Sequence, residues 1–151
     1  MKIIADDIMT EGVEVINDEM TVSQAAHLML RKRYSGYPIV SAEEENKVVG
    51  IITLTDLFIL IEKQVREGQA NNKLTEEVHV DVYKRLGCCK DMKVKEIMSK
   101  KVIMISKETP LDEIVISIID KHIHTFPVIE DGKLIGMVGR HDVLNAAFGY
   151  T

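Results

Sequence analysis

The sequence predicts a mixed α/β (α+β) fold in which two pseudo-symmetric β-α-β-β-α motifs pack as one module. The main observation is an internal repeat, in which four landmark residues of the first half recur in order in the second half: Met9 as Met98, Pro38 as Pro127, Gly50 as Gly136 and Asp56 as Asp142. The apolar spacing between the landmarks is similar in both copies, and only the turn 41–46 is longer than its counterpart, 130–132. A duplicated unit predicts pseudo-two-fold symmetry, with equivalent clefts where the copies face each other.

Length and composition limit what the chain can do. Its 151 residues, 46% hydrophobic and 28% charged, suffice for one sizeable core. We divide the chain into a first motif (1–67), a linker (68–92) and a second motif (93–151), which leaves little of this sequence for a separate catalytic domain. The formal net charge of −5 disfavours nucleic acid as a partner. The chain shows neither a signal peptide nor an apolar run of ~20 residues, so we expect a cytoplasmic protein and no membrane partner.

Each copy begins with a short strand and an amphipathic helix. The β-rich runs 13–16 and 102–105 are the expected strands. Apolar residues then follow at i, i+3, i+4, i+7 and i+8, which is one face of a helix: Val22, Ala25, Ala26, Met29 and Leu30 in the first copy, and Leu111, Ile114, Val115, Ile118 and Ile119 in the second. Thr109 and Pro110 suit the N-cap and the first residue of the second of these helices.

Two strands and a final helix complete each copy. The strands flank an acidic turn in the first copy and Glu-Asp-Gly in the second, and are expected at residues 37–40, 48–52, 126–129 and 134–138. The final helices are expected from Leu54 to about Glu67 and from Arg140 to about Phe148.

The linker is expected to hold a loop and a short helix, and it is longer than most connections. Whether it covers the module or contacts a partner is left open. It contains the adjacent pair Cys88 and Cys89, whose spacing suits neither a disulfide framework nor a zinc site. We interpret both as packing residues rather than redox groups. His122 and His124 lack further ligands at a metal-binding spacing, so we predict no metal site.

Any ligand chemistry is expected where the third strand of each copy meets the final helix. The first copy reads Gly50-Ile-Ile-Thr53-Leu-Thr55-Asp56, and the second reads Gly136-Met-Val-Gly139-Arg140-His141-Asp142. Thr53 and Asp56 have the pattern of a capping box, and Gly139 is an acceptable N-cap, so a purely structural role explains these residues. The same geometry also suits a nucleotide, because a helix start attracts phosphate and a carboxylate one turn in can accept both ribose hydroxyls.

These elements, taken in order, resemble a tandem cystathionine β-synthase (CBS) domain pair, also called a Bateman module, in a stand-alone protein. Ile8-Met9-Thr10 and Ile97-Met98-Ser99 open the two copies, and Tyr37-Pro38-Ile39-Val40 and Phe126-Pro127-Val128-Ile129 form the middle strands. The two Asp motifs close the copies, so the resemblance covers nearly the whole chain.

The resemblance implies two clefts for adenosine ligands: AMP, ADP, ATP or S-adenosylmethionine. The residues that it implies for the first site are Thr53, Thr55, Asp56, Val102, Ile103, Tyr37 and Pro38. In this site Asp56 would hold the ribose, the two threonines would lie near the phosphate, and Val102 with Ile103 would form a wall for the adenine. Tyr37 and Pro38 would flank the base.

The residues implied for the second site are Asp142, Arg140, His141, Val13, Val15, Phe126 and Pro127. Here Asp142 would hold the ribose, and Arg140 and His141 would lie near the phosphate. The run Val13 to Val15 would be the opposing wall, and Phe126-Pro127 would flank the base. His124 would face the phosphates at the centre of the module, where the first copy has Ser35. Gly139 stands where the first copy has the Thr53 hydroxyl, so a phosphate contact is lost there, although Arg140 and His141 could compensate with charged donors. The Asp56 site follows the family pattern more closely, whereas the Asp142 site is expected to carry more positive charge and could instead be the one that selects phosphates.

Two functional hypotheses follow. The first is a regulatory module that senses an adenine nucleotide and acts on a separate, unidentified partner protein. The alternative is a ligand-independent dimerisation or assembly module, in which the Asp motifs are only helix caps. Catalysis has no support, because no nucleophile–base set, Walker loop or dinucleotide fingerprint is present. The ligand and the number of occupied sites are left open.

The final helices also predict self-association. Phe58, Ile61, Val143 and Phe148 are apolar residues that one pair of copies is not expected to cover. In terms of the resemblance this implies a homodimer, whose order, head-to-head or head-to-tail, is left open.

Overall fold

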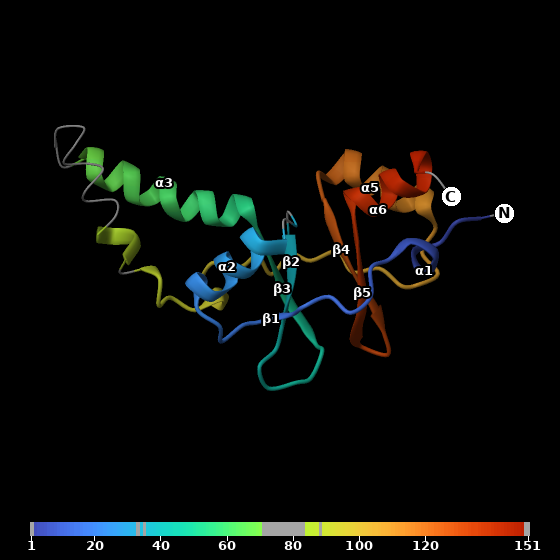
Figure 1. Cartoon of the computed structure of the whole chain (residues 1–151), viewed down its shortest axis with the longest axis horizontal. Helices are drawn as coiled ribbons and strands as arrows, with labels where there is room; N and C mark the ends of the chain where they lie inside the picture. Colours follow the sequence, from blue (N-terminus) through green and yellow to red (C-terminus); the bar gives the residue numbers. More distant parts are fainter. Residues whose placement is uncertain (1, 33, 35, 71–83, 88, 150–151) are drawn as a thin grey trace.

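The structure is a computed structural model that describes residues 2–32, 34, 36–70, 84–87 and 89–149. Its elements are, in order, α1 (Ala5–Ile8), β1 (Ile16–Asn17), α2 (Val22–Lys32), β2 (Gly36–Val40), β3 (Val48–Thr53), α3 (Leu54–Ala70), the 3-10 helix η1 (Val94–Glu96), α5 (Leu111–Lys121), β4 (Thr125–Glu130), β5 (Lys133–Gly139) and α6 (Arg140–Phe148). The two hairpins stand next to each other at the centre, with α2 and α3 on one side and α5 and α6 on the other (Figure 1). The mixed α/β class is therefore confirmed.

The first sheet contains β1, β2 and β3. β1 pairs with β2 in parallel, and β2 pairs with β3 in antiparallel register. The expected strand 13–16 is thus only Ile16–Asn17, because the sheet's hydrogen bonds begin at Ile16.

The second sheet contains only β4 and β5, joined by an Asp-Gly turn. Asp131 and Gly132 both have positive φ (52° and 77°), which matches the handedness of a two-residue hairpin turn. The expected strand 102–105 is wrong: a single bridge forms, in which Ile105 donates its N–H to the Pro127 carbonyl at 3.0 Å. The residues before Ile105 leave the sheet, and two of them line a cavity described below.

Both amphipathic helices form where the apolar spacing places them. Val22, Ala25 and Met29 of α2 are buried, and Ile114 of α5 is buried at the equivalent level. The predicted apolar faces are only half covered, however, since Leu30 and Ile119 are each 67% exposed. The N-cap of α5 is Pro110 rather than Thr109, because the Thr109 hydroxyl turns back to accept the Ser106 N–H at 3.0 Å.

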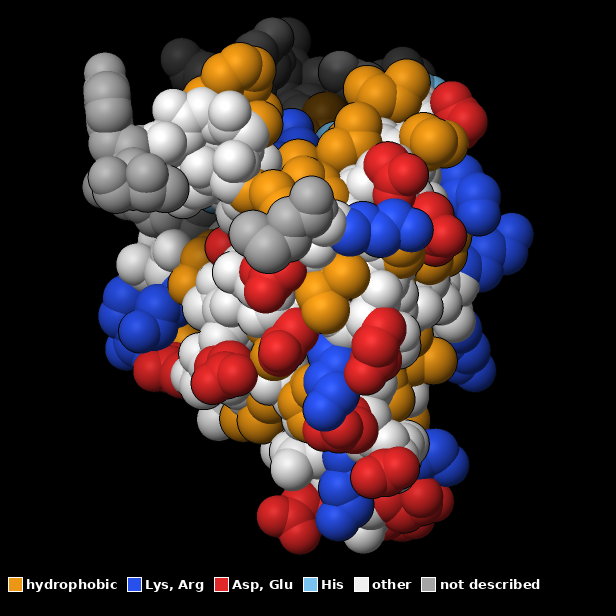
Figure 2. Space-filling model, turned by 90° about the vertical axis from the view of Figure 1, so that its right-hand side faces the viewer, with side chains coloured by type: hydrophobic (Ala, Val, Ile, Leu, Met, Phe, Trp, Pro, Cys, Tyr) orange, Lys and Arg blue, Asp and Glu red, His pale blue; other side chains and the backbone are white. Residues whose placement is uncertain are grey.

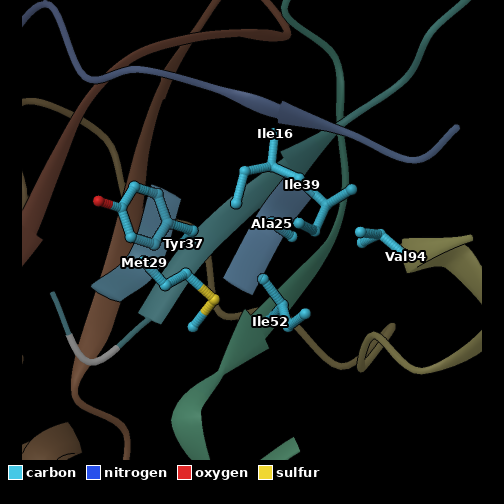
Figure 3. Packing of buried hydrophobic residues seen from close by; sticks show 7 residues of the cluster. All are labelled: Ile16, Ala25, Met29, Tyr37, Ile39, Ile52 and Val94. Carbon is cyan, nitrogen blue, oxygen red and sulfur yellow. The ribbon is translucent and has the colours of Figure 1, made fainter. Parts of the chain in front are cut away.

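Each copy has its own hydrophobic core. Figure 3 shows the first core, where Met29 of α2 and Ile52 of β3 approach from different elements and Val94 enters from the start of the second copy. Phe126 and Val138 are at the centre of the second core, and Val143 of α6 belongs to it with only 8% exposure. Val143 was expected to be exposed, and that expectation is wrong because α6 turns this side chain towards β4 and β5.

The two copies exchange their opening segments. Ala5, at the start of the first copy, is fully buried in the second core, and Val94 is fully buried in the first core. Thr10 and Met137 exchange two backbone hydrogen bonds of 2.9 and 3.0 Å, and Ser99 and Ile51 exchange two of 2.9 Å. Each third strand is therefore bordered by the Met-Thr or Met-Ser segment of the other copy.

Two glycines allow this exchange. A Cβ on Gly50 would lie 2.6 Å from the Met98 sulfur and 2.8 Å from the Ser99 carbonyl oxygen. A Cβ on Gly136 would lie 2.8 Å from the Met9 sulfur. All three distances are too short for a contact with a carbon atom, so the repeated glycine marks the close contact between the copies.

Within the described residues no helix has the length and apolarity needed to cross a membrane. Figure 2 shows the end of the molecule where α1, α5 and α6 lie: positive and negative side chains are interspersed on its lower part, and hydrophobic side chains gather at the level of α5 and α6. The described part of this face therefore carries charges of both signs rather than a single-sign patch.

The linker is described only near its end. Residues 84–87 and 89 are helical, which agrees with the expected short helix, whereas residues 71–83 and Cys88 lie outside the described residues. Cys89 is a free, partly buried thiol beside the apolar residues Leu57 and Leu86, as expected for a packing residue.

Candidate functional site

The two repeated aspartates cap the final helices. The Thr53 N–H donates to Oδ2 of Asp56 at 2.7 Å, and the Thr53 hydroxyl donates to the same oxygen at 3.1 Å. The Gly139 N–H donates to Oδ2 of Asp142 at 2.7 Å. The expected capping geometry is confirmed in both copies, and in each it leaves Oδ1 of the carboxylate for other partners.

A cavity of about 490 Å³ lies over the first cap. Its walls come from both copies and from the strand ends between them: Ile51, Thr53, Leu54, Thr55, Asp56, Ser99, Lys101, Val102, Ile103, His122, Ile123, His124, Thr125 and Arg140. We call this cavity the first cleft. Its volume lies within the range of small-molecule sites.

A second cavity of about 340 Å³ lies over the other cap. Its walls are Thr10, Lys32, Tyr34, Gly36, Thr125, Met137, Gly139, Arg140, His141 and Asp142. We call it the second cleft. The two clefts are related as the repeat predicts, since Thr10 corresponds to Ser99 and Asp142 to Asp56.

Many of the residues expected at the two sites are brought together. Thr53, Thr55, Asp56, Val102 and Ile103 all line the first cleft. Arg140, His141 and Asp142 line the second. His124, expected near the centre, is on the wall of the first cleft, and its counterpart Ser35 lies outside the described residues.

The residues expected to flank the bases are placed elsewhere. Tyr37, Pro38, Phe126 and Pro127 are all less than 2% exposed, and none of them lines either cleft. All five residues of β2 and the first four of β4 are buried, so the side chains on both faces of these middle strands are covered there. Val13 packs against the first core and Val15 is exposed, so the opposing wall expected for the second cleft differs as well.

The two carboxylates differ in their remaining hydrogen bonds. In the second cleft the Thr10 hydroxyl donates to Oδ1 of Asp142 at 3.0 Å, so both oxygens of this carboxylate are engaged. In the first cleft the equivalent Ser99 hydroxyl instead accepts the Lys101 N–H at 3.3 Å. Within the described residues, Oδ1 of Asp56 therefore remains open to a donor on a ligand.

The clefts also differ in charge. Lys101, His122, His124 and Arg140 face the first cleft, opposite one carboxylate. The Lys32 ammonium of the second cleft lies 3.6 Å from Glu14, which offsets its charge. Among the described residues the first cleft thus has the Lys101 ammonium, which forms no ion pair with a described residue, in addition to the Arg140 guanidinium that lines both clefts. This favours an anionic ligand.

The imidazole of His124 is protonated less readily than that of a free histidine. Partial burial lowers its pKa, and the nearby positive charge of Arg140, followed by that of His122, lowers it further. An anionic group bound between these side chains would oppose that shift, because it stabilises the imidazolium.

Sequence reasoning missed several wall residues. Lys101 and Ile123 of the first cleft, and Lys32 and Tyr34 of the second, were not anticipated. The repeat offers a signal for some of them, because Lys32 and Tyr34 precede the middle strand of the first copy at the positions that Lys121 and Ile123 hold in the second. Thr10 and Ser99 were recognised only as parts of the opening motif.

Comparison with protein families gives two matches within the chain. The model of the CBS domain matches residues 5–63 and again residues 94–149, well over half of the chain and once per copy. Within the described residues no group of three His, Cys, Asp or Glu side chains is placed to hold a metal ion.

Curated relatives are longer than this chain. A homoserine O-acetyltransferase from Methanococcus vannielii is 27% identical over 143 residues, which are 94% of this chain and 24% of the relative. The SNF1-related protein kinase regulatory subunit gamma-1 from Arabidopsis thaliana is 32% identical over 133 residues, which are 87% of this chain and 30% of the relative. The chain thus spans a quarter to a third of the length of these two relatives.

Solved structures share the fold over nearly the whole chain. CBSX2, solved in complex with AMP, superposes with a TM-score of 0.70 at 21% identity and covers 95% of both chains. The CBS domain pair of protein MJ0100, solved with 5′-methylthioadenosine and S-adenosyl-L-methionine, gives a TM-score of 0.70 at 21% identity and covers 99% of this chain and 98% of its own.

Proposed function

The chain belongs to the CBS domain family, and from that premise we propose that it is a regulatory module that binds an adenine nucleotide of the AMP, ADP or ATP type and acts on a partner protein. The observation that carries the proposal is the first cleft. The residues that line it combine a carboxylate with an open oxygen, the cations Lys101 and Arg140, and an apolar wall.

Each part of a nucleotide has a counterpart in this cleft. Oδ1 of Asp56 can accept hydrogen bonds from ribose hydroxyls while Oδ2 keeps its place in the cap. Val102 and Ile103 offer an apolar surface for the adenine. Arg140 and Lys101 offer charged donors for phosphate, and His124 offers an imidazole N–H. The arrangement favours a nucleotide, which carries negatively charged phosphate, over an uncharged nucleoside.

Two solved structures with the same fold support the class of ligand. CBSX2 was solved with AMP, and the MJ0100 domain pair with two adenosine derivatives. S-adenosylmethionine is therefore a further candidate ligand for this chain. The name of the kinase gamma subunit supports a regulatory role.

We infer that the chain is not itself an enzyme and that it signals through affinity for another protein. Ligand binding between the copies would stabilise one relative arrangement of the two sheets, and a partner that prefers this arrangement would bind more tightly. The exposed side chains Phe58, Ile61 and Phe148 support pairing of two chains as a homodimer. A cytoplasmic location completes the proposal.

Isothermal titration with AMP, ADP, ATP and S-adenosylmethionine tests the proposal, with GMP and GTP as controls. We expect saturable binding of adenosine ligands and none of the guanosine nucleotides. Folded protein that has been stripped of nucleotide and binds no adenosine ligand would refute it.

The alternative, a ligand-independent assembly module, is favoured by one observation: both aspartates already serve as helix caps. The two functions differ in the effect of Asp56→Asn. An amide can still accept the Thr53 N–H, so this variant retains most of the cap and loses the charge. A sensor loses ligand affinity at least tenfold with little change in melting temperature, whereas an assembly module shows no ligand binding before or after the change.

A further inference from the structure

One side chain is shared by the two clefts. Arg140 is the first residue of α6, directly after the cap glycine, and it lines both the first and the second cleft. Thr125, almost fully buried where the two hairpins meet, lines both clefts as well. The clefts therefore adjoin at the centre of the module, with Arg140 between them.

The repeat does not supply a second arginine. The residue equivalent to Arg140 in the first copy is Leu54, the first residue of α3. Leu54 lines the first cleft, where it offers no charge. A symmetric module would place one guanidinium at the start of each final helix, whereas among the described residues Arg140 is the one guanidinium that lines the clefts.

Among the described residues, other cations do not make up the difference in the second cleft. Lys101 and His124 line the first cleft besides Arg140. In the second cleft Lys32 is paired with Glu14 at 3.6 Å, and His141 is the other described basic side chain besides Arg140. Arg140 itself forms no ion pair with any described residue, so its guanidinium is available to a ligand.

We propose that two phosphorylated ligands compete for Arg140, so that filling the first cleft weakens the second cleft for a phosphorylated ligand but not for an unphosphorylated one. The proposal rests on the proposed function, because it concerns the same adenosine ligands. A guanidinium binds one phosphate in a bidentate manner and cannot offer the same donors to another. Losing such a contact weakens binding by about tenfold.

The coupling has a defined direction. The first cleft, with its open carboxylate oxygen and additional cations, fills first and recruits Arg140. By thermodynamic reciprocity, a phosphorylated ligand in the second cleft weakens the first cleft by the same factor. Adenosine carries no phosphate, so it binds the two clefts independently.

Titration of three proteins with AMP and with adenosine tests this inference. In wild type we expect two AMP-binding steps, the second of them weak. Asp56→Asn leaves one AMP per chain, counted by native mass spectrometry, and this AMP binds the second cleft about tenfold more tightly than the second step in wild type. Adding Arg140→Leu to Asp56→Asn removes that gain, and adenosine shows no gain in any of the proteins.

Two further variants serve as controls. Leu54→Arg supplies the missing guanidinium and is expected to strengthen the second AMP step of the otherwise unchanged protein. Lys101→Ala removes a cation that lines only the first cleft, so it weakens the first step. If Asp56→Asn fails to fold or still binds two ligands, Val102→Trp, which fills the first cleft, takes its place.

The outcomes separate the two proposals. Equal affinity of the second cleft for AMP with the first cleft open or blocked overturns the sharing of Arg140. Coupling that persists or grows in Arg140→Leu also overturns it, since repulsion between the two phosphates would then be the cause. Absence of binding by both AMP and adenosine refutes the proposed function instead.

Discussion

Gly50→Ala tests the contact through which the two copies hold each other. The added Cβ would lie 2.6 Å from the Met98 sulfur and 2.8 Å from the Ser99 carbonyl oxygen. The sulfur sits on a flexible side chain and can move, but the carbonyl belongs to the backbone that exchanges two 2.9 Å hydrogen bonds with Ile51. The change must therefore push the segment around Ser99 away from β3.

The cost follows from these contacts. Overpacking of a tight contact costs about 1–3 kcal/mol, and weakening two backbone hydrogen bonds adds about 1 kcal/mol. We expect Gly50→Ala to lower the free energy of unfolding by about 2–4 kcal/mol, which corresponds to a fall of about 5–15 °C in melting temperature for a chain of this size. The affinity of the first cleft should fall as well, because the displaced segment leads directly to Val102 and Ile103.

Thermal unfolding followed by circular dichroism measures the effect, with Gly87→Ala as the matched control. A Cβ on Gly87 meets nothing within 4 Å, and the residue is helical, so this change is expected to be neutral or slightly stabilising. Adding Met98→Ala to Gly50→Ala should recover only part of the loss, since the Ser99 carbonyl remains. If Gly50→Ala melts within about 1 °C of Gly87→Ala, the close contact does not hold the copies together and the reasoning is wrong.

Three other substitutions have defined outcomes. Tyr37→Phe removes a buried hydroxyl that has no hydrogen-bond partner among the described residues, so the free energy of unfolding measured in urea should stay equal or rise by about 1 kcal/mol. Burial also raises the pKa of Tyr37 to about 12, so above pH 10 the tyrosine ionises in the unfolded chain before it does in the folded chain. Wild type should therefore lose stability above pH 10, and the variant should lose less. Because the pKa of His124 is lowered, its imidazole is protonated at a lower pH in the folded chain than in the unfolded chain. Wild type should therefore lose a little stability as the pH falls below 6.5. The melting temperature of His124→Asn should decline less steeply over the same pH range. Ala5→Asp places a carboxylate in the second core and should lower the melting temperature by at least 10 °C; an unchanged value would mean that the opening segment does not stabilise that core.

The repeat made most of the fold predictable. The hairpins, both amphipathic helices and the final helices follow from local apolar spacing and turn residues, which are properties of neighbouring positions. The strand expected at 102–105 fails because pairing with a distant strand, rather than local β propensity, decides whether a strand forms. Val143 was misplaced because the sequence alone does not say which side of α6 faces the sheet.

The residues that line the candidate clefts were only partly predictable from the sequence. Asp56, Thr53 and Val102 were expected together and line one cleft. Tyr37 and Phe126 were expected beside the bases and are core residues that line neither cleft. The sequence alone could not decide between these positions, because an aromatic side chain on a middle strand can pack in the core or against a ligand. The hydrogen bond between Thr10 and Asp142 depends on the exchange of opening segments, a long-range feature that no local pattern encodes.

The exchanged segments mean that neither copy is a complete folding unit. A chain with one copy would leave its own third strand without the Met-containing border and would expose the core position that Ala5 or Val94 fills. Such a half could become complete only by borrowing the missing segment from a second half, whereas joining the halves in one chain supplies that segment at high effective concentration. We therefore expect that a cut within the linker leaves two fragments that stay associated, because the first residues of each fragment pack in the core of the other.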